Sequence, residues 1–191
     1  REDAPWCQGC RVHTGFAKAY EEVRPELIMA LRELSCRSVA VAGHSLGGAL
    51  ASLAILDFRA GLSLRVEPAY TFGKPRVGNL AYAAAFEAAA AQHGVEPMSW
   101  RVVHYKDPVP RIPLPTSWVH EMHEVFYDSR DSSSFRECEL NGDLVDTYED
   151  PTCSRAASVV ECLNFDHLHY LNQSFAYKTM DAKCKGAPLM V

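Results

Sequence analysis

The sequence lacks a cluster of basic residues, an internal repeat and an unbroken apolar run long enough to cross a membrane. Its 19 Lys and Arg residues are outnumbered by 24 Asp and Glu residues, so we expect neither a nucleic acid nor an anionic membrane surface as a partner. The absence of a repeat excludes solenoid and propeller architectures. The longest uncharged run, residues 38–56, is interrupted by three glycines, a histidine and two internal serines, which argues against a transmembrane helix.

The composition is that of an ordinary globular protein, except for its cysteines. With 191 residues, of which 48% are hydrophobic and 23% charged, the chain is expected to form a single domain over residues 1–191. Seven cysteines are many for a cytosolic protein of this size. They gather near the chain ends and after residue 135, which is typical of disulfides in a secreted protein. Because the count is odd, at least one thiol is free or bonded outside this chain.

The pentapeptide Gly43-His44-Ser45-Leu46-Gly47 is a G-x-S-x-G motif, which is typical of a nucleophile elbow. A short apolar run over residues 37–42 predicts a strand before it, and an Ala- and Leu-rich run predicts a helix after it. A sharp turn between the two lifts the serine clear of the sheet. We expect glycine on both sides of the turn because side chains there would collide, and we expect the helix N-terminus to stabilise negative charge beside Ser45.

Strand and helix patterns alternate along the first half of the chain, which predicts a mostly parallel sheet with helices on both faces. After residue 107, four prolines break regular structure, with a short strand over residues 124–127 and a short helix near 168–175. The other expected helices cover residues 15–35, 47–60 and 80–93, and the other expected strands cover residues 37–42, 65–72 and 99–105.

A nucleophilic serine needs a histidine base and a carboxylate that orients it. Asp107 directly follows an expected strand, and Pro108 prevents that strand from continuing past it. This position at a strand end is the one expected of the carboxylate that orients the base. His167 lies in a loop near the C-terminus and suits the base, with His169 as an equal alternative on spacing alone. Four other aspartates in loop-like segments remain alternatives for the acid: Asp128, Asp131, Asp143 and Asp146.

The chain resembles the fungal-type class 3 lipases, which are secreted triacylglycerol hydrolases with the α/β-hydrolase fold. The resemblance implies that Ser45 is the nucleophile, His167 the base and Asp107 the acid, with the Leu46 N–H as an oxyanion donor. It also implies that His44 and His120 lie near the substrate cleft. The matching stretches are residues 7–16, 41–51, 71–79, 107–113 and 166–170, in the order of the family.

The same resemblance indicates that the chain lacks family segments. In these lipases, a strand and turn upstream of the first matching stretch provide the second oxyanion donor, and the lid helix follows that turn. Neither has a counterpart here, so the α/β-hydrolase domain is expected to be partial and to have a bare hydrophobic sheet edge. We expect a second chain, such as the N-terminal half of the same precursor, to cover this edge and supply the missing strands and lid.

The resemblance also favours a disulfide between Cys7 and Cys10 over a redox motif or half of a zinc site. Cys138 and Cys153 bracket a polar loop and are expected to form a second bridge. Cys184 is expected to pair with a cysteine in the missing segment, and Cys36 and Cys162 remain unassigned. Although His167 and His169 follow Asp166 closely, no second cluster of ligands accompanies them, so we expect no metal and no cofactor.

These observations predict a serine carboxylic-ester hydrolase that acts on triacylglycerol or another glycerolipid at a lipid–water interface. It is expected in a secretory or other oxidising compartment, and its activity should fall below about pH 6, where histidine becomes protonated. The choice among lipase, phospholipase, galactolipase and short-chain esterase stays open. The alternative is a catalytically impaired, lipase-like subunit that serves a structural or binding role in a larger assembly, because one oxyanion donor is missing.

Overall fold

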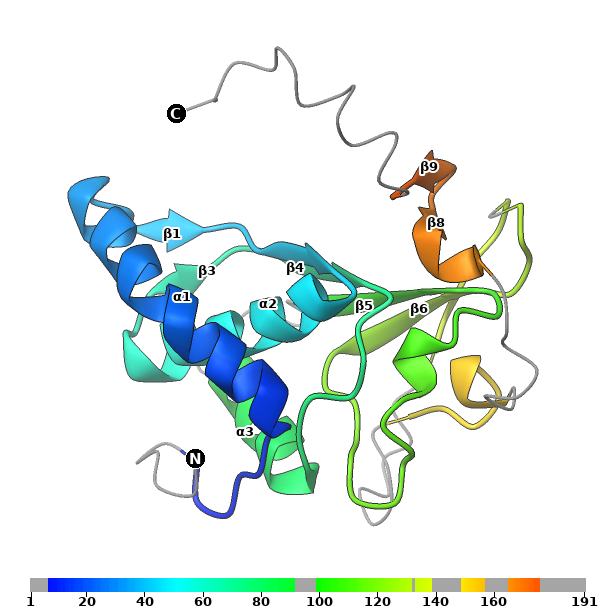
Figure 1. Cartoon of the computed structure of the whole chain (residues 1–191), viewed down its shortest axis with the longest axis horizontal. Helices are drawn as coiled ribbons and strands as arrows, with labels where there is room; N and C mark the ends of the chain where they lie inside the picture. Colours follow the sequence, from blue (N-terminus) through cyan, green and yellow to red (C-terminus); the bar gives the residue numbers. More distant parts are fainter. Residues whose placement is uncertain (1–6, 92–98, 132, 139–148, 157–164, 176–191) are drawn as a thin grey trace.

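A computed structural model describes residues 7–91, 99–131, 133–138, 149–156 and 165–175 of the chain (Figure 1). Its centre is a five-stranded sheet in which the first four strands are parallel and the last is antiparallel. In spatial order the strands are β2 (Ala42–His44), β4 (Ala69–Phe72), β5 (Ser99–His104), β6 (His123–Tyr127) and β7 (Arg136–Glu137). A short parallel pair, β1 (Ser38–Val39) and β3 (Arg65–Val66), lies upstream of β2 and β4. The mostly parallel sheet expected from the sequence is therefore present.

Three helices pack together over one face of this sheet, namely α1 (Thr14–Glu33), α2 (Leu46–Leu56) and α3 (Leu80–Ala91) (Figure 1). The central helix, α2, is apolar on nearly all sides because it lies between the sheet and the other two helices. A π-helical turn, Asp57–Gly61, continues it and carries the buried Phe58. Within the described ranges, the C-terminal end of the opposite face is covered by residues 165–175, where Tyr170 packs edge-on against Phe72 and His104.

The strands and helices differ from the expected ranges where local chemistry intervenes. The strand expected over residues 65–72 is divided into β3 and β4 around Pro68, which has no N–H to donate. The helix expected near residues 168–175 is wrong. A 3₁₀ turn, Phe165–Leu168, is followed by a hairpin of β8 (His169–Tyr170) and β9 (Gln173–Ser174). Leu171 and Asn172, with φ of 51° and 59°, reverse the chain between these strands.

Buried ion pairs join loops that are distant in sequence. The Arg76 guanidinium donates to both carboxylate oxygens of Glu149, at 2.7 and 2.6 Å, and both side chains are almost fully buried. Its remaining nitrogen, Nη1, donates to the carbonyls of Arg111 at 2.6 Å and Pro113 at 2.8 Å. This one side chain therefore connects the loop after β4, the loop after β5 and residue 149. Two further buried pairs are Lys74–Glu121 and Arg101–Glu124.

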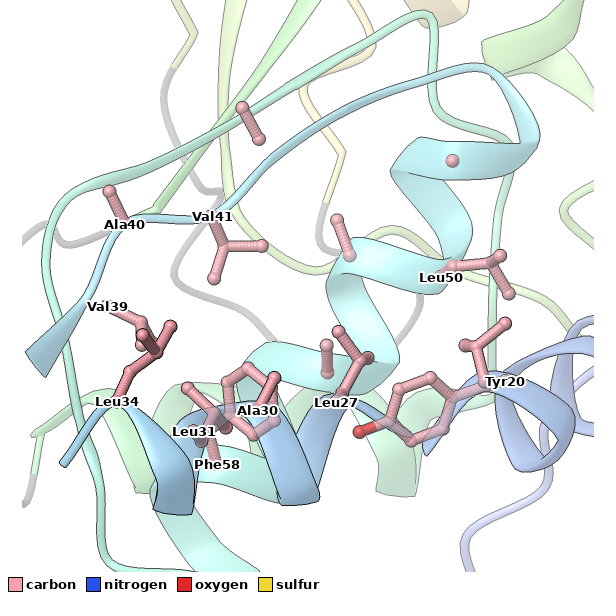
Figure 2. Close-up of a pocket in the computed structure, with 15 residues that line it drawn as sticks. Tyr20, Leu27, Ala30, Leu31, Leu34, Val39, Ala40, Val41, Leu50 and Phe58 are labelled. Atoms are coloured by element: carbon pink, nitrogen blue, oxygen red, sulfur yellow. The ribbon is translucent and has the colours of Figure 1, made fainter. Parts of the chain in front are cut away.

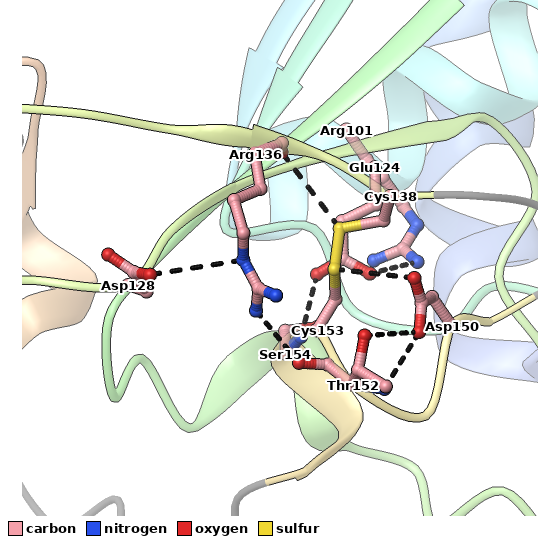
Figure 3. Close-up of a disulfide and its surroundings, with 9 residues drawn as sticks. All are labelled: Arg101, Glu124, Asp128, Arg136, Cys138, Asp150, Thr152, Cys153 and Ser154. Carbon is pink, nitrogen blue, oxygen red and sulfur yellow. Dashed lines mark hydrogen bonds and ion pairs between the residues drawn. A yellow bond between two sulfur atoms is a disulfide. The ribbon is translucent and has the colours of Figure 1, made fainter.

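Two disulfides are present in the described part of the chain. Cys7 is bonded to Cys10 before α1, and Cys138 to Cys153 beyond β7. Figure 3 shows that the second bridge lies beside Ser154, whose N–H donates to the Glu124 carboxylate at 3.1 Å. Cys36 is a free, partly buried thiol. Cys162, which was left unassigned, and Cys184, which was expected to pair with a cysteine in the missing segment, lie outside the described residues.

The Arg76–Glu149 pair should contribute measurably to stability. Glu149→Gln leaves the buried guanidinium without its counter-charge, so we expect the free energy of unfolding to fall by about 3 kcal/mol. Urea denaturation of the purified chain measures this change. The matched control is Glu67→Gln, since the Arg65–Glu67 pair is largely exposed and should contribute less than about 1 kcal/mol. Equal effects of the two substitutions would contradict a structural role for the buried pair.

The same pair should make stability depend on pH in acid. Burial alone would raise the pKa of Glu149, but hydrogen bonds and charge attraction from Arg76 outweigh it and hold the pKa below its usual range. A lowered folded-state pKa stabilises the protein fully above the unfolded value of about 4.3. This contribution is lost as pH falls through the folded-state pKa. The Glu149→Gln variant should lack this component when unfolding is followed between about pH 6 and pH 3.

Candidate active site

Ser45 stands in a strained turn between the end of β2 and the start of α2. Its φ of 56° and ψ of −125° lie in a region that non-glycine residues rarely adopt. The turn is fastened by the Ser45 N–H, which donates to the Phe72 carbonyl at 2.9 Å. Leu46 is the first residue of α2, so its N–H has no acceptor within the helix and lies beside the serine. The backbone geometry is that of a nucleophile elbow.

The two glycines of the motif have different roles. A Cβ on Gly43 would lie 2.3 Å from the Gly47 carbonyl oxygen, so β2 and α2 approach each other too closely for any side chain there. A Cβ on Gly47, in contrast, would meet nothing within 4 Å. The expectation that a side chain at either position would collide is therefore wrong for Gly47, which begins the exposed side of α2.

The structure brings Ser45, His167 and Asp107 together in one hydrogen-bonded line. His167 Nε2 lies 2.7 Å from Ser45 Oγ, and His167 Nδ1 lies 2.9 and 3.0 Å from the two carboxylate oxygens of Asp107. With the proton on Nδ1 shared with the carboxylate, the Nε2 lone pair faces the serine hydroxyl. Asp107 is fully buried, whereas 18% of the His167 side chain is exposed. This arrangement is suited to removing a proton from Ser45.

Three further donors hold Asp107. The Val109 N–H donates to Oδ1 at 2.8 Å, and the Tyr170 hydroxyl donates to Oδ2. Arg111 Nη1 donates to the Asp107 backbone carbonyl at 2.7 Å. Burial and the nearby Asp107 charge raise the pKa of Tyr170 well above its ordinary value, so its hydroxyl remains a donor. The sequence analysis assigned no role to Tyr170, although Tyr170 lies three residues after His167 in the matching stretch of residues 166–170.

Gly73, at the end of β4, is a second site residue that sequence reasoning missed. Its φ is +58°, and a Cβ there would lie 2.7 Å from Asp107 Oδ2, 2.9 Å from the Tyr170 hydroxyl and 3.0 Å from His167 Nδ1. The backbone of Gly73 therefore packs directly against Asp107 and His167, where no side chain would fit. Its position immediately after a strand was the one sequence feature that could have indicated this role.

His44 supports His167 from its own strand. The two imidazole rings stack with their centroids 4.6 Å apart. The His44 ring also stacks against Phe175, with centroids 4.4 Å apart. Burial lowers the pKa of His44, so its ring is neutral and Nε2–H donates to the His167 carbonyl at 2.8 Å. The structure places His44 against the base. Its contact with substrate, implied by the resemblance, stays a prediction.

His120 lies in the protein interior rather than at an open cleft, with only 1% of its surface exposed. Its Nε2–H donates to the Pro110 carbonyl at 2.7 Å, and its Nδ1 lies 3.3 Å from the Lys74 ammonium. Burial and the charges of Arg101 and Lys74 hold its pKa well below the ordinary value, so the ring is neutral. The expected cleft position is thus corrected: His120 supports the turn that follows Asp107.

The rival residues do not join this site. His169 begins β8 with an exposed side chain, two residues beyond the histidine that contacts Ser45. Asp128 and Asp131 are exposed in the loop after β6, and Asp143 and Asp146 lie outside the described residues. In the part of the chain with described coordinates, one group has metal-ligand proximity, namely Cys138, Asp150 and Cys153. Its two sulfurs are bonded to each other, so they are not thiolate ligands (Figure 3).

The close approach at Gly43 provides a test of the elbow that does not require a substrate. Gly43→Ala should separate β2 from α2 and lower the free energy of unfolding by about 1–3 kcal/mol. Gly47→Ala, in the same motif, should be neutral or stabilise the helix by up to about 1 kcal/mol. Thermal unfolding of both variants measures the difference. Equal effects of the two substitutions would contradict the geometry of the elbow.

Comparisons with known proteins agree with this geometry. The family model "Lipase (class 3)" matches residues 1–117. Lipase A of Sodiomyces alcalophilus is 36% identical over 143 residues, covering 69% of this chain and 34% of the relative. Secreted mono- and diacylglycerol lipase A of Penicillium cyclopium is 33% identical over 133 residues, covering 67% of this chain and 41% of the relative.

Solved structures give the same result for the fold. The lipase from Rhizopus microsporus var. chinensis superimposes with a TM-score of 0.70 at 30% identity, covering 90% of this chain and 58% of that structure. The chain therefore spans well under two thirds of the length of these relatives and has the α/β-hydrolase fold in the part it spans. The elbow, the order of the matched motifs and the family model together show that this chain belongs to the class 3 lipases.

Proposed function

We propose that this protein hydrolyses carboxylic esters of lipids through an acyl-enzyme on Ser45. The observation that carries the proposal is the continuous line of hydrogen bonds from Ser45 through His167 to the buried Asp107. Membership of the class 3 lipases supports lipid esters as the substrate class.

In the first half of the reaction, Ser45 Oγ attacks the ester carbonyl carbon while its proton passes to His167 Nε2. The Oγ–C bond forms as the carbonyl π electrons move to oxygen, and the Leu46 N–H at the helix N-terminus stabilises that negative charge. The imidazolium is stabilised by Asp107, which stays ionised. The bond to the alkoxy oxygen then breaks, and His167 returns its proton to the departing alcohol.

In the second half, water replaces the alcohol. His167 takes a proton from the water as its oxygen attacks the acyl carbon, and the bond between that carbon and Ser45 Oγ breaks as His167 returns the proton to Oγ. The products are a free fatty acid and the original serine. Asp107 keeps the His167 ring in the same tautomer throughout, because its carboxylate accepts the Nδ1 proton.

Acylglycerols are the proposed substrates, taken at a lipid–water interface. The relatives include enzymes named mono- and diacylglycerol lipases and the triacylglyceride lipase of Rhizomucor miehei. None of the helices in the described ranges has the length and apolar character needed to span a bilayer. We propose a secreted or other oxidising location, since several relatives are named as secreted and two disulfides are present here.

Covalent labelling of Ser45 tests the proposal. A fluorophosphonate should phosphonylate the natively purified protein on Ser45 Oγ, forming the O–P bond as fluoride leaves, and mass spectrometry should locate the adduct. Ser45→Ala is the matched control and should not be labelled. Well-folded protein that remains unlabelled would contradict the proposal and would favour the alternative of a lipase-like subunit with a structural role.

The contact between Tyr170 and Asp107 should appear in the kinetics. Tyr170→Phe removes one donor from the carboxylate, which leaves more of its negative charge for the His167 imidazolium. We expect the rate on a soluble ester to fall about tenfold and the acid limb of the pH–rate profile to move to higher pH. Tyr127→Phe is the control, because the described contact of that ring is with Phe135. An unchanged pH profile would contradict a positioning role for Tyr170.

A further inference from the structure

One asparagine of the chain carries the acceptor sequence for N-linked glycosylation. The tripeptide Asn172-Gln173-Ser174 has the form Asn-x-Ser, in which the middle residue is not proline. The other three asparagines have alanine or aspartate two positions later, so none of them is an acceptor: Asn79, Asn141 and Asn164. Because such a short motif also arises by chance, its structural surroundings have to show whether it is a site.

Asn172 lies at the tip of the hairpin of β8 and β9, where a bulky group displaces no packed side chain. The antiparallel pairing of Tyr170 with Gln173 leaves Leu171 and Asn172 as the two residues of the turn. Both turn residues are exposed. Figure 1 shows that this hairpin stands on the side of the sheet away from α2 and α3. The acceptor is therefore in the surface turn that the motif requires.

The carboxamide of Asn172 is not used to hold the fold. Among the described residues it has no hydrogen-bond partner. Asn79 provides the contrast, because its Oδ1 accepts from the Arg11 N–H at 2.9 Å and the Tyr82 N–H at 3.2 Å, and its Nδ2 donates to the Gly9 carbonyl at 3.0 Å. Nδ2 of Asn172 can thus carry a substituent without loss of a structural contact.

The two faces of the hairpin have different tasks. Tyr170 is buried and donates to the Asp107 carboxylate. His169, its neighbour on β8, is exposed, as expected when successive residues of a strand point to opposite sides. The contacts that orient the base therefore lie on the inner face of the hairpin. A glycan at the tip lies outside them.

Leu171, the other turn residue, is unfavourable as a bare side chain in this position. Its φ of 51° lies in the left-handed region, which favours glycine, asparagine and aspartate. Leu171 is also 45% exposed. A sugar on the adjacent Asn172 lies within reach of the leucine, and one face of a pyranose ring presents C–H groups that cover apolar surface.

We propose that Asn172 is an N-glycosylation site and that the first sugar of its glycan covers Leu171. In the transfer step, Nδ2 attacks C1 of the sugar on a lipid-linked oligosaccharide diphosphate, which the secretory compartment supplies together with the transferase. The N–C1 bond forms, the C1–O bond breaks, and the diphosphate leaves with the electron pair while Nδ2 loses a proton to the transferase. The inference rests on the proposed secretory location and not on the proposed chemistry of Ser45.

A purely conformational role is the competing explanation for Asn172. Its φ of 59° is one that asparagine tolerates well, so the turn alone would account for this residue. The turn alone does not account for Ser174 two positions later, nor for an exposed leucine at a positive φ. Glycosylation accounts for all three.

Mass spectrometry of the protein purified from its natural source tests the proposal. Peptide-N-glycosidase in heavy-oxygen water converts a glycosylated asparagine to an aspartate that carries the heavy oxygen. The peptide that contains residue 172 should be labelled in this way. Asn141 and Asn164 are controls within the same digest and should remain unlabelled, because they lack the acceptor sequence. An unlabelled residue 172 would overturn the proposal.

A pair of substitutions at residue 174 tests whether the sugar covers Leu171. Secreted from a eukaryotic host, Ser174→Ala should lose the glycan, whereas Ser174→Thr keeps the acceptor sequence and should retain it. The readout is exchange of the Phe175 amide, which donates to the Leu168 carbonyl at 2.7 Å across the hairpin. We expect exchange about fivefold faster in Ser174→Ala, since about half of a leucine side chain returns to water. Equal exchange in a glycosylated Ser174→Thr and a bare Ser174→Ala would overturn the contact with Leu171.

The same natural sample separates a failure of this site from a failure of the proposed location. If residue 172 is unlabelled and the Cys7–Cys10 and Cys138–Cys153 disulfides are formed, the location stands and Asn172 serves the turn alone. If residue 172 is unlabelled and these cysteines are reduced, the proposed location fails together with the glycan.

Discussion

The site depends on a single buried charge, the carboxylate of Asp107. A carboxylate removed from water is stable only when donors replace the lost hydration. Here its two oxygens accept from the Val109 N–H, the Tyr170 hydroxyl and the His167 ring. The first donor belongs to the loop that carries Asp107 itself, and the other two belong to residues 165–170. Satisfying this one charge therefore fixes the loop after β5, the hairpin of β8 and β9, and the orientation of the catalytic imidazole.

The surroundings of the site are arranged to keep that loop in place. Arg111 donates to the backbone carbonyls of Asp107 and Tyr105, and its own carbonyl accepts from the buried Arg76. His120 donates to the Pro110 carbonyl in the same turn. The short turn that carries the acid is thus held by side chains from two other segments. Backbone strain lies close to the site at two places: Ser45 has a φ of 56° at the end of β2, and Tyr105, two residues before Asp107, has a φ of 40°.

Much of this arrangement was predictable from the sequence, for physical reasons. The G-x-S-x-G motif predicts an elbow, and the partners of its serine are expected at the ends of later strands. Ser45 and Asp107 could therefore be proposed from residue type and position, whereas the choice of His167 over His169 needed the resemblance. Tyr170 and Gly73 could not be proposed, because their role depends on contacts with residues that are tens of positions away and that only the fold brings close. The cleft position of His120 came from the resemblance alone, and its burial, which sequence patterns do not specify, makes it an interior support instead.

Local chemistry also explains the errors in secondary structure. Residues 168–175 contain enough apolar side chains to suggest a short helix, yet Leu171 and Asn172 reverse the chain so that Tyr170 can reach Asp107. A tertiary hydrogen bond to a buried charge outweighs a weak local preference for helix. The apolar face of α1 belongs to the same class of long-range effect. Its pattern predicts a buried surface, and in the structure part of that surface lines an apolar pocket together with α2 and residues 39–42 (Figure 2).

The central claim is that Asp107 orients the base that activates Ser45. The most direct measurement is the second-order rate constant for phosphonylation of Ser45 by a fluorophosphonate in the wild-type protein and in Asp107→Asn. The amide matches the carboxylate in shape, but it favours the tautomer of His167 that cannot accept the serine proton. The account predicts a decrease of about four orders of magnitude, with the fold retained. An unchanged rate in folded Asp107→Asn protein would contradict it.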